Sequence, residues 1–195
     1  KALADDPAVQ LNMATIDPGA VNMGGLAPGG NKELSDFVFT VSHRDARYVM
    51  SMARDYRFPF SVVVREPGHI RHALIYYEMG LVDAPLFFKI CLNDDVPWGM
   101  PPSPAAIAAY LSVIPAEVPY IWMNYTYGPS TWAMNLHAIA TGGHVRTGIG
   151  DNPVEPDGAR LTNAEKVSRV VEIARRVGRE TATPDEALAI MRGTA

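Results

Sequence analysis

The sequence has 195 residues, of which 48% are hydrophobic, and a formal net charge of −4 at pH 7. This length and composition predict one globular domain over residues 1–195 with a buried core. The weakly acidic charge, without any basic run, excludes the electrostatic footprint of a protein that binds nucleic acid or an anionic membrane surface.

The only cysteine, Cys91, lies in an apolar run, so the chain forms no internal disulfide and no cysteine-rich zinc site. No stretch reaches the roughly 18 apolar residues of a membrane span, and the first residues lack the apolar core of a signal peptide. These features together predict a cytoplasmic protein without a membrane partner. The chain does not begin with methionine, and we interpret it as starting inside a longer one.

The first predicted strand, at 9–16, is mostly apolar and ends at the turn sequence 17–19. A glycine-rich loop follows, with Gly24 and Gly30 near its ends. Two interpretations of this loop stay open: it exposes backbone N–H groups to the phosphates of a ligand, or it is a surface connection. After a short extended segment, a serine and an aspartate three residues later predict the start of a helix that reaches about Tyr56.

The rest of the chain alternates apolar strands with amphipathic helices, and polar residues follow several of the strands directly. The predicted strands lie at 60–64, 86–92, 120–125 and 144–149, and the helices between and after them begin near 67, 103, 130, 162 and 183. We count about five strand–helix units, and this order predicts right-handed βαβ units and a parallel sheet.

The stretch 141–152 reads Thr-Gly-Gly-His-Val-Arg-Thr-Gly-Ile-Gly-Asp-Asn. It predicts a short strand entered through a Gly-Gly turn, with Arg146 and Asp151 five residues apart towards its carboxyl end, where barrel enzymes carry their chemistry. Together with the proline-glycine loop that follows and the sequence Thr-Asn-Ala-Glu at 162–165, it resembles the last strand of the β-keto acid cleavage enzymes. The resemblance extends from about Ala14 to Ile190.

The resemblance implies a (β/α)8 TIM barrel, in which three strand–helix units would precede the first residue. A complete barrel usually takes about 250 residues, so we interpret the chain as a partial barrel with about the last five β/α units. A truncated gene, an amino-terminal part outside this sequence, or an open sheet that closes by pairing with another chain would each explain the length. Relatives of this kind tend to form tetramers, so a homo-oligomer is expected.

The same resemblance implies an enzyme that exchanges acyl groups between a β-keto acid and acetyl-CoA, giving acetoacetate and a new CoA thioester. Asp151 matches the general base of the family, and Arg146 matches the arginine that positions the base and the substrate. From the residues alone, a structural ion pair at a strand end is an equally good interpretation. The expected partners are therefore a small β-keto acid and a CoA thioester.

Zinc is the cofactor that the resemblance implies. The family holds it with a His-x-His pair on an early strand and a glutamate directly before the base. The histidine pair would precede Lys1, and Gly150 occupies the position of the glutamate. Glu66 is the best-placed carboxylate to replace the missing ligand, although an exposed acid at a helix entry explains it as well. Otherwise the chain binds metal weakly, differently or not at all.

Two residues are also assigned to substrate binding. Glu66 follows one predicted strand directly, and Asn124 lies near the end of another. Because polar groups at the mouth of a pocket orient a small ligand, we expect both side chains at the pocket rim. Asp94 and Asp95 follow a third strand, which suggests a keto acid with a cationic or polar tail.

Two other functions stay open. A metal-independent lyase of the aldolase type would keep the barrel and Asp151 as the base, and it would form no CoA thioester. A non-catalytic, degenerate barrel would bind a small acid or a partner subunit, since a fold does not fix a function. Gly150 and the missing histidines favour the degenerate barrel, whereas Arg146 and Asp151 at their expected spacing favour an enzyme.

Overall fold

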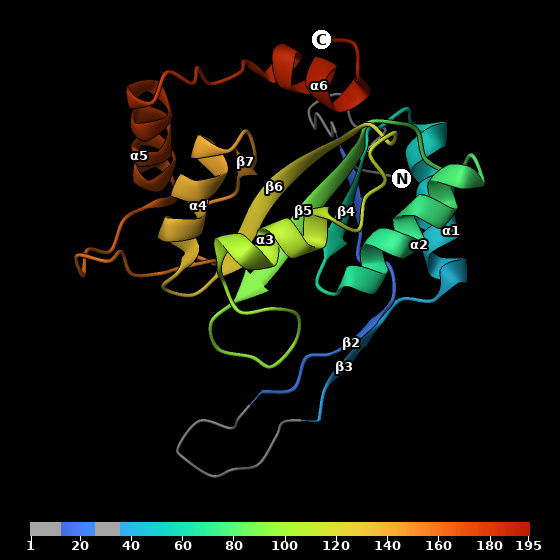
Figure 1. The fold of residues 1–195 in the computed structure, drawn as a ribbon, viewed down its shortest axis with the longest axis horizontal. Helices are drawn as coiled ribbons and strands as arrows, with labels where there is room; N and C mark the ends of the chain where they lie inside the picture. Colours follow the sequence, from blue (N-terminus) through green and yellow to red (C-terminus); the bar gives the residue numbers. More distant parts are fainter. Residues whose placement is uncertain (1–12, 26–35) are drawn as a thin grey trace.

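The computed structural model describes residues 13–25 and 36–195 (Figure 1). In chain order its elements are β1 (Ala14–Ile16), β2 (Ala20–Asn22), β3 (Val38–Thr40), α1 (His43–Asp55), β4 (Phe60–Val64), α2 (Pro67–Glu78), β5 (Leu86–Asn93), α3 (Pro104–Leu111), β6 (Tyr120–Tyr127), α4 (Thr131–Ala140), β7 (His144–Val145), α5 (Asn163–Arg176) and α6 (Pro184–Arg192). None of the helices in this part of the chain is long and apolar enough to cross a bilayer.

Five strands form one parallel sheet in the order β1-β4-β5-β6-β7. This order never reverses, as in the wall of a β/α barrel and unlike the sheet of a doubly wound fold. The predicted parallel α/β architecture is confirmed, and the sheet is consistent with part of a barrel. Closure of that barrel stays a prediction. A separate antiparallel hairpin, β2–β3, extends from the sheet at the carboxyl end of β1 (Figure 1).

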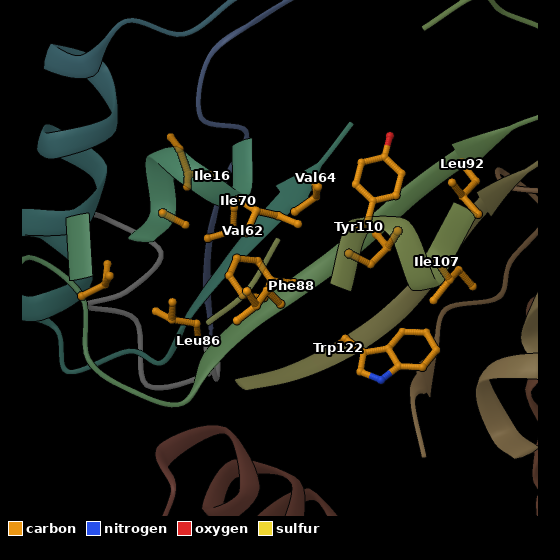
Figure 2. Close-up of a cluster of buried hydrophobic side chains, with 14 of the residues drawn as sticks. Ile16, Val62, Val64, Ile70, Leu86, Phe88, Leu92, Ile107, Tyr110 and Trp122 are labelled. Carbon is orange, nitrogen blue, oxygen red and sulfur yellow. The ribbon is translucent and has the colours of Figure 1, made fainter. Parts of the chain in front are cut away.

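One face of the sheet packs against helices. Because side chains alternate along a strand, every second residue of β4 and β5 points to this face, including Val62, Val64 and Phe88. They meet Ile70 of α2 and Tyr110 of α3 in one apolar core (Figure 2). Burying a side chain of this size stabilises the fold by about 2 kcal/mol, so this core fixes the register of the strands.

The alternate residues point to the opposite face, which we call the site face and define by Val63, Lys89, Cys91 and Tyr125. Arg65 pairs with Cys91 across the sheet if the register of β4 and β5 is continued by one residue. A smaller apolar cluster covers part of the site face and includes Trp98, from the loop after β5. Because Lys89 and Arg65 point to it, the site face carries charged residues.

Three helices begin as the sequence predicts. Ser42, Thr162 and Thr183 each accept a hydrogen bond from the backbone N–H three residues later, and the acid at that position bonds back to the cap. Such reciprocal caps satisfy N–H groups that a helix cannot pair internally. The cap at Thr162 matters most for the site, because it fixes where α5 begins after the loop that follows Asp151.

The structure differs from the sequence prediction at two places. The predicted strand at 144–149 is shortened to β7, because the chain turns at Gly148, whose carbonyl accepts the N–H of Asp151 at 3.1 Å. The predicted glycine-rich loop contains β2, which pairs with β3. The residues of that loop at 26–35 and the start of the first predicted strand at 9–12 lie outside the described residues.

Candidate active site

Arg146 and Asp151 form a two-pronged ion pair just beyond β7. Arg146 Nε donates to Asp151 Oδ2 at 3.1 Å, and Nη2 lies 2.9 Å from Oδ1. The second contact is not aligned as a hydrogen bond, so Oδ1 has no hydrogen-bond donor among the described residues. The Asp151 side chain is only 2% exposed, whereas that of Arg146 is 41% exposed. The arginine thus covers a buried carboxylate and keeps a solvent-facing side.

The guanidinium of Arg146 stacks on the aromatic ring of Tyr125. Its central carbon lies 3.8 Å from the centre of the Tyr125 ring, a close cation–π contact. The hydroxyl of Tyr125 in turn bonds that of Tyr127. Burial disfavours the charged guanidinium, but the bonds to Asp151 outweigh this, and the pKa of Arg146 is raised above its usual value. Arg146 therefore stays a cation at every working pH.

The backbone of Arg146 is held by the main-chain carbonyl of Asn124 and by the side-chain amide of Asn135. Its N–H donates to the Asn124 carbonyl at 3.1 Å, and its carbonyl accepts from Asn135 Nδ2 at 3.1 Å. Asn124 Nδ2 donates to Asn135 Oδ1 at 2.7 Å, and Thr126 Oγ1 donates to Asn124 Oδ1. The side chain of Asn124, predicted at the pocket rim, thus lies between β6 and α4, where it supports Arg146.

The turn that carries Asp151 is pinned to the start of α5. Asn163 Oδ1 accepts the N–H of Ile149 at 2.9 Å. The same oxygen would lie 3.3 Å from a Cβ at Gly148, so a side chain at this glycine would press on the contact. The Asp151 carbonyl accepts the N–H of Gly128 at 2.9 Å, which ties the turn to the end of β6. Both contacts hold the carboxylate in place.

A second ion pair, between Arg65 and Asp17, joins the ends of β4 and β1. The Arg65 guanidinium lies 5.2 Å from the Phe39 ring and 5.7 Å from the Trp98 ring. Nε of Arg65 and Nε1 of Trp98 have no hydrogen-bond partner among the described residues. Sequence reasoning did not select Arg65, although a charged residue directly after a buried strand was the available signal.

Lys89 is a third cation on the site face that sequence reasoning did not select. Its Nζ donates to Thr15 Oγ1 at 2.6 Å, across from β5 to β1. Burial and then repulsion from Arg146 lower the pKa of Lys89 to about 8. A lysine in the middle of an otherwise apolar strand was the only sign of it in the sequence.

Glu66 lies at the carboxyl end of β4 and is the N-cap residue of α2. Its Oε1 accepts the N–H of Gly99 at 2.9 Å, so the carboxylate holds the loop after β5. Asp94, at the start of that loop, accepts bonds from the N–H and hydroxyl of Ser130 at 2.8 and 2.7 Å. Neither carboxylate contacts the Arg146–Asp151 pair, and Asp94 acts as a clamp between two loops.

The residues present do not form a zinc site of the expected kind. The described ranges 13–25 and 36–195 contain no group of three His, Cys, Asp or Glu side chains that could hold a metal. Within the described residues a Cβ at Gly150 would meet nothing within 4 Å, and the glycine itself supplies no ligand. His69 is buried, and its Nδ1 accepts the N–H of Arg65. Burial lowers the pKa of His69 to about 4, which leaves it neutral.

A cavity of about 450 Å³ lies beside the site face. Lys89 and Arg146 contribute its two charged groups, and α5 contributes apolar side chains. Its lining consists of Met13, Lys89, Met123, Val145, Arg146, Thr147, Val167, Val170, Val171 and Thr181. A small molecule in this cavity would contact Arg146, whose other side holds Asp151.

Comparisons with known proteins identify the family. The family model described as beta-keto acid cleavage enzyme matches residues 3–192. The 3-keto-5-aminohexanoate cleavage enzyme of Fusobacterium nucleatum is 30% identical over 182 residues, 92% of this chain and 60% of that protein. The enzyme of the same name from Acetoanaerobium sticklandii is 31% identical over 129 residues, 66% of this chain and 46% of that protein. The chain thus spans about 60% or less of either relative.

Proposed function

The chain belongs to the β-keto acid cleavage enzyme family, and on this basis we propose that it exchanges acyl groups between a β-keto acid and acetyl-CoA. The products are acetoacetate and a new CoA thioester. The observation that carries the proposal is the buried Asp151 carboxylate, held by an arginine that keeps an exposed side. A general base next to a fixed cation is what carbon–carbon bond exchange next to a keto group requires.

Asp151 is the proposed base. It takes a proton from the carbon between the keto group and the carboxylate, and the resulting enolate attacks the acetyl carbonyl of acetyl-CoA. The released CoA thiolate adds to the original keto carbon, and the bond to the central carbon breaks. Acetoacetate leaves as an enolate and takes the proton back from Asp151. Oδ1 supports this role, because it accepts no aligned hydrogen bond within the described residues, although it lies 2.9 Å from Arg146 Nη2.

Arg146 is the proposed cation that holds the substrate and the negative charge of the enolate. Its Nε and Nη2 face Asp151. The other N–H groups of the guanidinium remain for a carboxylate or enolate oxygen on the exposed side. The Tyr125 ring and the Asn135 amide keep the guanidinium and the backbone in place. Preorganised charge of this kind is usually a large part of catalysis.

No step is assigned to zinc, because the described residues do not supply its ligands. Zinc itself, a homo-tetramer and a cytoplasmic location remain predictions that the resemblance supplies. Metal analysis and light scattering of the purified protein test the first two.

Incubation with acetyl-CoA and a panel of β-keto acids, followed by mass spectrometry, tests the proposed reaction. We expect acetoacetate and one new CoA thioester, formed about a thousandfold more slowly by Asp151→Asn. Asp157→Asn is the matched control, because Asp157 lies on the same loop and is 60% exposed. Cleavage without a CoA thioester would identify a lyase instead, and binding without any turnover would identify a degenerate barrel.

A further inference from the structure

The cavity beside the site face has an unusual charge balance. Its lining includes two cations, Lys89 and Arg146, and no acid. The charge of Arg146 is compensated by Asp151, but within the described ranges no carboxylate lies within ion-pair distance of Lys89. The residue is only 8% exposed. An uncompensated buried cation costs free energy, so its presence calls for an anionic ligand.

The groups around Lys89 suit a carboxylate. Nζ has three N–H donors, and one of them is used by Thr15 Oγ1. The hydroxyl of Thr15 receives that bond and keeps its own proton to donate. Most of the remaining walls are apolar side chains such as Met123 and Val170, and two threonines complete them. A ligand with a carbon chain and a terminal carboxylate matches both the walls and the charge.

The depth of Lys89 sets the length of that ligand. Cys91 pairs with Tyr125, on whose ring Arg146 lies, and Lys89 comes two residues earlier on β5. Two residues of a strand span about 6.6 Å. A molecule whose reacting end lies at Arg146 therefore reaches Lys89 with a tail of a few carbon atoms.

We propose that Lys89 and Thr15 bind a second carboxylate, so that the preferred substrate is a short dicarboxylic β-keto acid. This inference rests on the proposed acyl exchange. Binding of a carboxylate by Lys89 and Thr15, however, does not require turnover. It replaces the expectation of a cationic tail. An ammonium group in this cavity would meet two cations, and the carboxylate of Asp94 is already bonded to Ser130.

The first test is a ratio of activities. We compare kcat/KM for a dicarboxylic β-keto acid and for the monocarboxylic acid of equal chain length. The wild type is expected to favour the diacid about ten- to a hundredfold, as for a charge-assisted bond. In Lys89→Met this ratio falls to about one, and Lys89→Arg, which keeps the charge, retains most of it. An equal loss for both acids would assign Lys89 to the reacting carboxylate and overturn the proposal.

The second test measures binding without chemistry. Calorimetry with glutarate and with pentanoate compares a diacid and a monoacid of the same length. We expect glutarate to bind more tightly and to lose this advantage in Lys89→Met, while Arg175→Met, an exposed cation on α5, keeps it. Equal affinities in the wild type would overturn the subsite. Acyl exchange that fails beside selective glutarate binding would instead refute the proposed function alone.

Discussion

Replacing Lys89 by methionine should stabilise the protein at pH 7. The pKa of Lys89 falls from 10.5 to about 8 in the folded chain, mainly through burial. Within the described part of the chain the charged or titratable groups near Lys89 are Arg146, Cys91 and Arg65, and none of them is a carboxylate. A fall of this size corresponds to about 3 kcal/mol. The lost bond to Thr15 costs about 1 kcal/mol, so we expect a net gain of about 2 kcal/mol.

The sign of this effect defines its pH window. A lowered lysine pKa means that the unfolded chain binds the proton more tightly, so the penalty is fully present below about pH 8. It disappears as the pH rises towards 10.5, the ordinary value for this side chain. Urea unfolding of the wild type and of Lys89→Met at pH 7 and at pH 9.5 measures this penalty. The titration of all other groups contributes equally to both proteins and therefore drops out of the difference in unfolding free energy. A variant that is less stable at pH 7, or a difference that does not shrink with pH, would refute the reasoning.

Three other substitutions follow from the contacts around the proposed base. Asp151→Asn should lower the rate of acyl exchange by about a thousandfold with an unchanged circular dichroism spectrum; an active variant would remove Asp151 as the base. Asn163→Ala removes the acceptor of the Ile149 N–H and should lower kcat clearly while the melting temperature changes little. A lower melting temperature with an unchanged kcat would show that Asn163 has a purely structural role. Lys166→Met removes the buried partner of Glu155 and leaves this carboxylate paired only with the partly exposed Arg169. The free energy of unfolding, measured with urea, should fall by about 3 kcal/mol, and adding Glu155→Gln should recover part of the loss.

Local patterns in the sequence were sufficient to predict most elements of the fold. Capping boxes set the starts of three helices, and a β-branched run marked the buried strand β4. The contact between Arg146 and Asp151 was also predictable, because five residues at the end of a strand keep the two side chains within reach. Such features depend on a few neighbouring residues and on intrinsic propensities.

The rest of the site depends on strand register, which a single sequence does not show. Lys89 and Thr15 are 74 residues apart and meet only because β1, β4 and β5 pair as they do. The same cause explains Asn124. Its distance from the end of β6 was compatible with a rim position, but the alternation of strand side chains turns it towards α4. Shifting the register by one residue would exchange the two faces.

The amides of Asn124 and Asn135 lie between β6 and α4, in the layer where the sheet packs against helices, and they support the site from there. Both residues are almost completely buried in a layer that is otherwise mostly apolar. Two apolar residues would pack there without any need for hydrogen-bond partners, and replacing a buried polar pair in this way is often neutral for stability. Instead, the Asn135 amide donates to the Arg146 carbonyl, and the Asn124 amide donates to Asn135 Oδ1 and so orients it. Their position is therefore better explained by the orientation of the Arg146–Asp151 pair than by the stability of the core.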